Sequence, residues 1–389
     1  MTLSLAIISR DINNAFSNSL FGVYHTGDNI EVRGIKTKEL TDFTFMISDP
    51  TKRFLTQPFR YNNIAATIAE TFWVMAGRDD LEFLKFFLPN CIDYSDNGET
   101  WRGGYGPRLR KYHCDPKDEA INQIENVIEI LDDDAFSRQA IIIIPYPDYD
   151  YHCIVQTKDK PCTISIQFLI RDKKLHCFVR NRSNDAIWGT FNINVFEWTF
   201  LQEIIAGILN VEIGEYHHNA ISFHIYENMF RRTEKMLKYQ GYNIYENDKD
   251  LIQGKPLKFN SVHEFTDVME LIVTLIENII NETKIYHEEE MYSDFSLHHN
   301  TINIVDYINV TLSYVAMQKE QYDRAYSLLS FVDSIKMLPL KICGFEYFFR
   351  FLKKNNQVEF RHFLDKLFLE TWIKQLSKQT KQFMLQEIK

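Results

Sequence analysis

The sequence predicts a mixed α/β fold followed by a helical region. Helical patterns alternate with strand-like patterns through about residue 258, and such alternation is typical of a sheet covered by helices. The clearest pair of strands is a hairpin in the middle of the chain, at residues 164–181. From residue 261 onward the patterns are helical only. We therefore expect an α/β domain over 1–258 and an all-helical C-terminal extension over 259–389.

Size, composition and charge indicate a folded protein. The chain has 389 residues, of which 45% are hydrophobic and 14% aromatic, enough to offset the entropy lost on ordering. The formal net charge of −10 argues against nucleic acid as a partner, because proteins that bind it usually present a basic surface. A small anionic ligand held by a few arginines remains compatible with this charge.

Neither the N-terminal segment nor the hydropathy indicates export or membrane insertion. Residues 1–16 contain a short apolar run but no basic start and no small-residue cleavage site, as a signal peptide would have. No window approaches the roughly 18 to 20 apolar residues of a membrane span. We expect a cytoplasmic protein without a membrane partner. Its six cysteines form no CxxC pair and should be individual thiols.

The first predicted elements of the α/β region are helices. Residues 61–77 carry apolar side chains on neighbouring turns and predict a buried helix, and a second helix is predicted at 79–87. Asn-Gly, Gly-Gly and Gly-Pro pairs predict a loop over 91–110. A helix is predicted at 118–131, and the run QAIIII at 139–144 predicts a buried strand.

The central hairpin gives the strongest strand signal. Apolar and polar residues alternate over 164–170, a turn is predicted at 172–174, and the segment 175–181 returns. Later elements are predicted as helices at 192–209, 227–239, 268–280, 323–332 and 360–368, with one strand at 215–226.

Cys162 is the residue on which the functional interpretation depends. It begins the first strand of the hairpin, and Arg182 follows the end of the return strand. Because a hairpin brings its two open ends together, we expect the thiol and the guanidinium to be neighbours. A nearby cation favours the thiolate, which is the nucleophilic form of cysteine. The alternative is that Cys162 is one more buried, unreactive cysteine.

The segment around Cys162 resembles the active-site hairpin of the thymidylate synthase family, in which Pro-Cys-His leads to Arg-Ser-x-Asp over the same separation. Here the two segments read PCT at 161–163 and RSND at 182–185. The resemblance covers roughly residues 30 to 235, and several ordered motifs are more specific than one. The further motifs are RGIKTKEL with Arg33, AETFWVMAG with Glu70, GGYGPRLR with Tyr105, SRQAIII with Arg138, and FHIY with His224 and Tyr226.

The resemblance implies a thymidylate synthase-like fold and transfer of a one-carbon unit from methylenetetrahydrofolate to position 5 of the dUMP pyrimidine. Position 5 of uracil is a poor nucleophile, so the Cys162 thiolate would first add to position 6 and turn the ring into an enolate. Glu70 would organise the water near the base. Tyr105 and Asp185 complete the implied catalytic set, and no metal is expected.

The resemblance also implies which side chains hold the two substrates. A phosphate needs planar, permanently charged donors, and Arg33 and Arg182, helped by Ser183, suit it. Arg138 would reach across a two-fold axis into the partner's site, which implies a homodimer. The other implied contacts are Gln167, His224 and Tyr226 for the nucleotide, and Tyr94, Asp185 and Glu70 for the folate.

The choice of base is assigned to an asparagine. Uracil offers a donor at N3 and an acceptor at O4, and one amide can serve both, whereas cytosine reverses the pattern. The family's base-reading asparagine falls at Asn192 or Asn194, and counting back from the following helix favours Asn194. Either residue could instead be only a helix cap.

Departures from the family's pattern bear on the last step of the reaction. Thr163 replaces a histidine, Gln139 replaces an arginine, and Tyr94 stands where tryptophan is usual. About 130 residues replace the short apolar tail that closes the synthase site. Because hydride transfer needs a closed, dry site, these changes favour addition of water to the methylene intermediate, giving 5-hydroxymethyl-dUMP. The segments RGxxTKE and YSDNG also resemble nucleotide hydroxymethylases of bacteriophages.

Two alternatives stay open. The first is a thymidylate synthase, in which hydride transfer gives dTMP. The second is a catalytically silent, nucleotide-binding member whose C-terminal helices bind a protein partner. The His-His-Asn segments at 217–219 and 298–300 do not predict a metal site, because adjacent histidines on a strand point to opposite faces.

Overall fold

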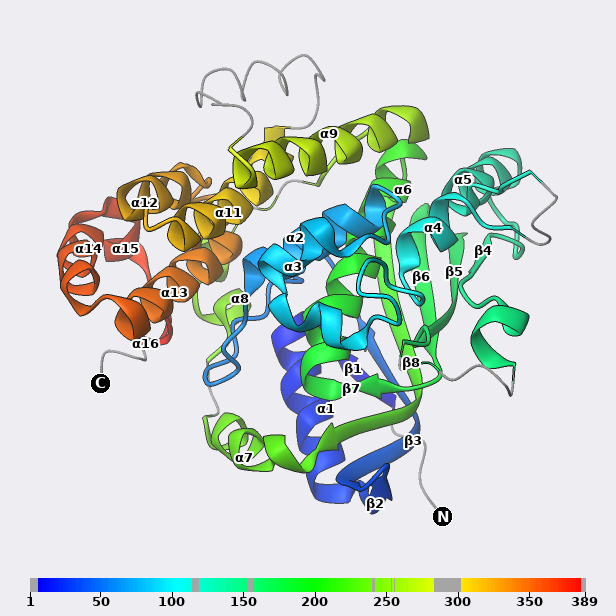
Figure 1. Cartoon of the computed structure of the whole chain (residues 1–389), viewed down its shortest axis with the longest axis horizontal. Helices are drawn as coiled ribbons and strands as arrows, with labels where there is room; N and C mark the ends of the chain where they lie inside the picture. The colour runs from blue at the N-terminus through cyan, green and yellow to red at the C-terminus, as the bar shows by residue number, and fades with distance from the viewer. Residues whose placement is uncertain are drawn as a thin grey trace. The chain divides into compact units, whose positions relative to one another are not determined.

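Figure 1 shows the computed structural model of the chain, which describes residues 6–113, 119–152, 157, 159–239, 242–252, 254, 256–282 and 302–385. The chain divides into two compact units. The first unit consists of Met1–Arg53, Ala69–Phe230 and Lys258–Glu277, and the second of Phe54–Ile68, Arg231–Leu257 and Asn278–Lys389. The boundary near residue 258 stays a prediction.

The first unit is built on the predicted mixed sheet. Its main path runs β1, β3, β8, β6, β5, β4, with β2 paired to β3 and β7 paired to β8. β1 is parallel to β3, and both β6 and β7 are parallel to β8, whereas the other pairs are antiparallel. The strands are Ala6–Ser9 (β1), Asp28–Val32 (β2), Ile35–Ile47 (β3), Ile141–Ile143 (β4), Thr163–Arg171 (β5), Lys174–Asn181 (β6), Asn184–Asp185 (β7) and Glu212–Tyr226 (β8).

The predicted central hairpin is β5 and β6. Its turn residues Asp172 and Lys173 have φ angles of 51° and 62°, the left-handed conformation of a two-residue turn that matches the twist of the strands. At the open end Thr163 pairs with Asn181, and the next backbone bond runs from Arg182 N to Cys162 O at 2.9 Å. The hairpin therefore sets Cys162 beside Arg182.

The two faces of the sheet differ in burial. Along β8, Tyr216, His218 and Ala220 are buried, and the intervening Glu215 and His217 are only half-buried. Helices α1 (Ile12–Thr26) and α6 (Val195–Ile208) pack against the buried face. Alternation along a strand separates the two sets of side chains, so the other face of the sheet is left partly exposed.

The remaining helices follow the predicted order. Those predicted at 61–77, 79–87 and 118–131 are present as α2, α3 and α5. The helices of the chain up to residue 280, besides α1 and α6, are Ile64–Met75 (α2), Leu81–Phe87 (α3), Pro89–Tyr94 (η1), Tyr105–Arg110 (α4), Gln123–Asp133 (α5), Pro147–Tyr151 (η2), Ala186–Asn194 (η3), Glu227–Met229 (η4), Phe230–Lys238 (α7), Ile244–Asn247 (α8), Lys249–Leu251 (η5) and Val262–Ile280 (α9).

Two local predictions were wrong. The segment 91–110 is not loop throughout, because Tyr105–Arg110 forms α4 after Gly104. The run at 139–144 is not a fully buried strand, since Ile141 and Ile143 are 36% and 43% exposed and only Ile142 between them is buried. β4 is the edge strand of a sheet that is covered on one face, so alternate residues reach solvent.

The second unit contains the helices of the C-terminal region. Among them α13 packs against α11, α12, α14 and α16. Aromatic rings fill its core. Tyr326 stacks on Phe363 with the ring centres 5.3 Å apart, and Phe345 contacts the Tyr326 ring edge-on. The helices are Ile302–Gln318 (α11), Tyr322–Phe331 (α12), Leu338–Asn355 (α13), Gln357–Leu369 (α14), Thr371–Gln375 (α15) and Lys378–Met384 (α16).

The structure also bears on the predictions for membrane spans and for the cysteines. None of the described helices is both long and apolar enough to cross a lipid bilayer. Cys91, Cys162, Cys177 and Cys343 are free thiols, as predicted. Cys114 and Cys153 lie outside the described residues, as does the second His-His-Asn segment at 298–300.

Candidate active site

A cavity of about 320 Å³ in the first unit gathers many of the side chains that the sequence singled out. It is named here the Cys162 cavity. Its walls come from α2, α4, the open end of the hairpin, β7, η3 and the end of β8. Distant segments thus converge on one concave space, as a ligand site requires. The predicted site residues that line it are Glu70, Tyr105, Cys162, Ser183, Asp185, Asn194, His224 and Tyr226.

The Cys162 thiol contacts the Arg182 guanidinium. Nη2 of Arg182 lies 3.8 Å from Sγ, and the same guanidinium donates to the carbonyls of Pro161 and Lys160, both at 2.9 Å. Burial raises the pKa of the thiol, the Arg182 charge lowers it, and the Asp159 charge raises it. Burial prevails, so the expected effect of Arg182 is present but does not by itself produce a thiolate at neutral pH.

Tyr105 fixes the residue next to the thiol. Its hydroxyl oxygen accepts hydrogen bonds from the backbone N–H of Thr163 at 3.3 Å and from the Thr163 hydroxyl at 3.2 Å. Its ring packs on the Trp198 ring, with the ring centres 5.2 Å apart. Burial raises the pKa of Tyr105 above its usual value, so the phenol keeps its proton. That proton remains available to a bound ligand.

Two buried carboxyl groups interact, and one of them lines the cavity. Glu70 of α2 lines it, and burial raises the pKa of Glu70 to about 8. Glu197 of α6 is fully buried; burial and then the Glu70 charge raise its pKa, and hydrogen bonding to Asn194 lowers it. Two close carboxylates in an apolar interior cannot both ionise. Both groups are therefore protonated at neutral pH.

Replacing Glu70 by glutamine is expected to flatten the pH dependence of stability. Between the ordinary pKa of 4.5 and the folded value of about 8, the unfolded chain releases the Glu70 proton and the folded chain keeps it. The free energy of unfolding therefore falls as pH rises through this window, and glutamine removes that loss. Urea unfolding at both ends of the window measures it, with exposed Glu82→Gln as control. An unchanged slope in Glu70→Gln would contradict the assignment.

The amide of Asn194 is oriented by its neighbours. Asn184 Nδ2 donates to Asn194 Oδ1 at 2.9 Å and lies 3.3 Å from Nε2 of His218. Burial lowers the pKa of His218 to about 3, so its ring is neutral and accepts. Tyr216 OH lies 2.8 Å from the other ring nitrogen. This buried chain of hydrogen bonds fixes which end of the Asn194 amide is oxygen.

Several predicted site residues do not line the Cys162 cavity. Arg33 is exposed at the β2–β3 turn with φ 55°, although its charge lowers the pKa of Tyr226 against the larger effect of burial. Tyr94 is 58% exposed on η1, and Asn192 is half-buried on η3. Arg138 is exposed, and its carbonyl accepts from Gln167 Nε2 at 2.9 Å, on the partly exposed face of the sheet.

Trp101 is a lining residue that the sequence did not single out. It stands between the Cys162 cavity and a second cavity of about 870 Å³ that also shares Gly104. Its indole N–H donates to the Cys91 carbonyl at 3.0 Å. The Trp73 ring packs edge-on against it, with the ring centres 5.8 Å apart. A tryptophan inside a glycine-rich segment was the available signal. The second cavity adds Arg102, Lys111, Tyr112, Tyr146 and Tyr149.

Asp159 ties the glycine-rich segment to the residues before Cys162. Its carboxylate accepts from Gly103 N at 2.8 Å. A Cβ at position 103 would lie 2.6 Å from Asp159 Oδ1, which is closer than atoms pack. Gly103 is therefore required for this approach. The sequence offered no signal for Asp159.

Comparison with known proteins finds one matching family model and several similar enzymes. A family model described as thymidylate synthase matches residues 14–254. The deoxyuridylate hydroxymethyltransferase of Delftia phage PhiW-14 is 31% identical over 320 residues, covering 78% of this chain and 85% of that protein. That of Bacillus phage SP01 is 26% identical over 349 residues (86% and 91%). The thymidylate synthase of Francisella philomiragia is 26% identical over 196 residues (47% and 68%).

Proposed function

Because the chain belongs to the thymidylate synthase family and is a one-carbon transferase, we propose that it hydroxymethylates dUMP with methylenetetrahydrofolate, giving 5-hydroxymethyl-dUMP and tetrahydrofolate. The choice of the hydroxymethyl product rests on the share of the chain that each relative matches. Two phage deoxyuridylate hydroxymethyltransferases align with 78% and 86% of the chain, against 47% for the Francisella thymidylate synthase. The phage similarity thus reaches into the helices that replace the synthase's closing tail.

Cys162 is the proposed nucleophile. Its sulfur, after losing the thiol proton, adds to C6 of uracil, and the electron pair moves onto O4 as an enolate. C5 then bonds the folate's methylene carbon. Loss of the C5 proton and of the folate nitrogen gives an exocyclic methylene, to which water adds before the sulfur leaves C6. The half-buried thiol beside Arg182 and the cavity wall at Cys162 support this role.

Glu70 is proposed to act as a neutral acid. Because burial raises its pKa to about 8, the carboxyl carries a proton at neutral pH and can donate a hydrogen bond to O4 or to a water beside it. Such a donor stabilises negative charge where it develops during addition of the thiolate. Burial and the Glu70 charge raise the pKa of Glu197 as well, so this neighbouring carboxyl is also neutral. Ser183, His224 and Tyr226 are proposed to hold the ribose and phosphate side of the cavity, and Asp185 is proposed to contact the folate.

Asn194 is proposed to read the base. Asn184 uses one lone pair of its oxygen. The other lone pair and an N–H of the same amide match the N3–H donor and O4 acceptor of uracil. Asn194 lines the Cys162 cavity and Asn192 does not, which supports Asn194 over its neighbour.

The second cavity is proposed to hold the folate. It opens beside Trp101 and offers tyrosine rings together with Arg102 and Lys111, groups that suit a flat pterin and an anionic glutamate. Trp101, rather than the exposed Tyr94, then forms the wall between folate and nucleotide.

A homodimer is proposed to complete the phosphate site. Arg138 lies away from the Cys162 cavity, with Gln167, on the partly exposed sheet face, so it would serve the partner's nucleotide. We expect Cys162→Ser and Arg138→Ala each to be nearly inactive alone. Mixed after unfolding and refolding together, they should regain up to about a quarter of the wild-type rate, because random pairing leaves some dimers with one intact site. Mixtures that stay inactive would contradict the shared site.

The product distinguishes the proposed function from its alternatives. The purified full chain is incubated with dUMP and methylenetetrahydrofolate, and both products are identified by mass spectrometry. Hydroxymethylation adds CH₂O to the nucleotide and yields tetrahydrofolate. A gain of CH₂ with dihydrofolate would assign the chain as a thymidylate synthase instead. No change, with dUMP still bound, would favour a silent nucleotide-binding member.

A further inference from the structure

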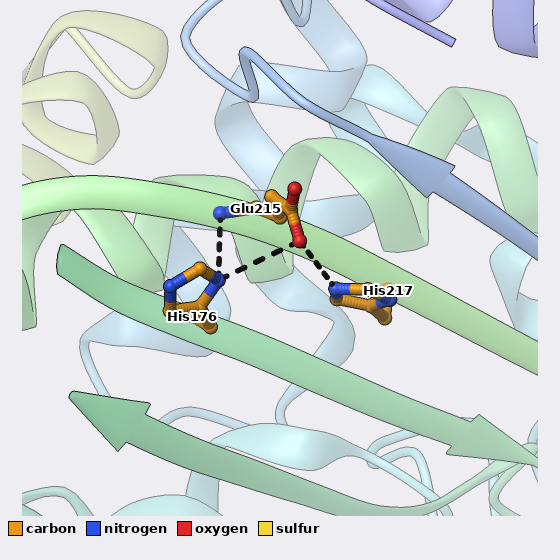
Figure 2. Close-up of side chains that lie close together, drawn as sticks. All are labelled: His176, Glu215 and His217. Carbon is orange, nitrogen blue, oxygen red and sulfur yellow. Dashed lines mark hydrogen bonds and ion pairs between the residues drawn. The ribbon is translucent and has the colours of Figure 1, made fainter. Parts of the chain in front are cut away.

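Three metal-ligating side chains meet on the partly exposed face of the sheet. His176 of β6 and Glu215 and His217 of β8 offer two imidazole nitrogens and a carboxylate oxygen, all within 4.8 Å of one another (Figure 2). Glu215 and His217 are two residues apart on one strand and so face the same side. We propose that this cluster, the β6–β8 site, binds a divalent transition-metal ion such as Zn²⁺.

The distances in the β6–β8 site suit such an ion. Zinc bound tetrahedrally at about 2.0–2.1 Å holds its ligand atoms roughly 3.3 Å apart. Here His217 Nε2 lies 3.1 Å and His176 Nδ1 lies 3.8 Å from the same oxygen, Oε2 of Glu215. Small side-chain rotations are therefore enough. Two imidazoles with one carboxylate favour zinc and its transition-metal neighbours over Mg²⁺ and Ca²⁺, which prefer oxygen ligands.

The backbone around the β6–β8 site makes room for the His176 ring. The register of β6 against β8 shifts between Leu175 and Cys177, where β8 carries an extra residue. Gly214 lies in this bulge, and a Cβ there would come within 3.0 Å of the His176 ring and 2.9 Å of the Leu175 carbonyl oxygen. A side chain at 214 would crowd the imidazole and this carbonyl, so the bulge and the glycine together make room for the ring.

The rings of the β6–β8 site are held in place and partly reachable. His217 stacks on Phe178 with ring centres 4.5 Å apart, and the Glu215 N–H donates to His176 Nδ1 at 3.2 Å. Coordination through Nδ1 exchanges that hydrogen bond for a metal bond. The side chains of His176, Glu215 and His217 are 18%, 40% and 29% exposed. Within a single chain these ligand atoms are therefore reachable from solvent.

The sequence did not predict this site, because its third ligand comes from another strand across a bulge. The Glu-x-His spacing on β8 was the available signal.

Metal binding by the full-length protein tests the β6–β8 site. Protein freed of metal by a chelator is titrated with Zn²⁺ by calorimetry, and with Co²⁺, whose visible absorption reports tetrahedral nitrogen and oxygen ligands. We expect one ion per chain. His176→Gln, Glu215→Gln and His217→Gln should each weaken Zn²⁺ binding by about 100-fold or more. His263→Gln is the matched control, because His263 pairs with Asp267 on the exposed side of α9, where the described residues offer no third ligand.

Folding of the variants is checked by circular dichroism and by thermal unfolding of the metal-free proteins. Zn²⁺ should raise the melting temperature of wild type and His263→Gln, but not of the three β6–β8 variants. Absence of binding to wild type would overturn the proposal. So would equal binding by folded β6–β8 variants, which would mean an adventitious ion only. Any one of the three variants that folds is sufficient for this comparison.

Discussion

Replacing Cys162 by serine is expected to lower kcat by about 10⁴-fold or more. The serine hydroxyl is nearly isosteric with the thiol but is not ionised at accessible pH, so it cannot add to C6 of the pyrimidine. The Arg182 guanidinium should stay in place, because it also donates to the Pro161 and Lys160 carbonyls. Initial rates with dUMP and methylenetetrahydrofolate measure the loss.

Two comparisons separate a lost nucleophile from a damaged fold. The dissociation constant of dUMP, measured by calorimetry, should change by only a few-fold in Cys162→Ser, because the serine keeps the shape of the cavity. Cys91→Ala changes a buried cysteine that does not line the Cys162 cavity, and its kcat should stay near wild type. Turnover by Cys162→Ser at close to the wild-type rate would exclude Cys162 as the nucleophile.

Replacing Asn194 by aspartate is expected to change the preferred base from uracil to cytosine. Beside Glu197 and Glu70 the new carboxyl should hold a proton, so it offers one O–H donor and one carbonyl acceptor. Cytosine needs that pattern at N3 and its amino group. The ratio of kcat/KM for dUMP over dCMP should fall by about 10³-fold or more, because uracil then leaves buried polar groups unpaired.

Asn192 supplies the matched control for this change. It lies two residues away on η3 but does not line the Cys162 cavity. Asn192→Asp should therefore keep the preference for dUMP within a few-fold. If Asn192→Asp changed the preference and Asn194→Asp did not, the base-reading role would pass to Asn192. The rates for both nucleotides and both variants decide between the two.

The parts of the fold that could be predicted are those whose pattern is local. The hairpin was evident because alternation and a two-residue turn specify it without help from the rest of the chain, and Asp172 and Lys173 adopt the turn expected. The strands β1 and β3 and the helix α1 were not assigned. Burial of Ile142 between exposed neighbours likewise depends on which face of the sheet the helices cover, and no local pattern reports that.

The candidate site shows the same division between local and distant information. The contact of Cys162 with Arg182 follows from the hairpin, so it was foreseen. The net rise in the pKa of Cys162 was not foreseen. Burial raises this pKa more than the Arg182 charge lowers it, and burial depends on packing. Glu197, Asn184 and Trp101 join the site through contacts that no spacing predicts. The resemblance to a family supplied residue roles. Those of Arg33 and Arg138 remain predictions, whereas the wall predicted at Tyr94 is proposed to be Trp101 instead.

Covalent trapping tests most directly whether the sulfur of residue 162 bonds to the pyrimidine. In dUMP the hydrogen at position 5 leaves as a proton. Fluorine at that position cannot leave in this way, so the covalent adduct of Cys162, the nucleotide and methylenetetrahydrofolate should persist. Mass spectrometry of the digested chain should place nucleotide and folate on the peptide containing Cys162. A label on another residue, or turnover of dUMP without any trapped adduct, would contradict the account.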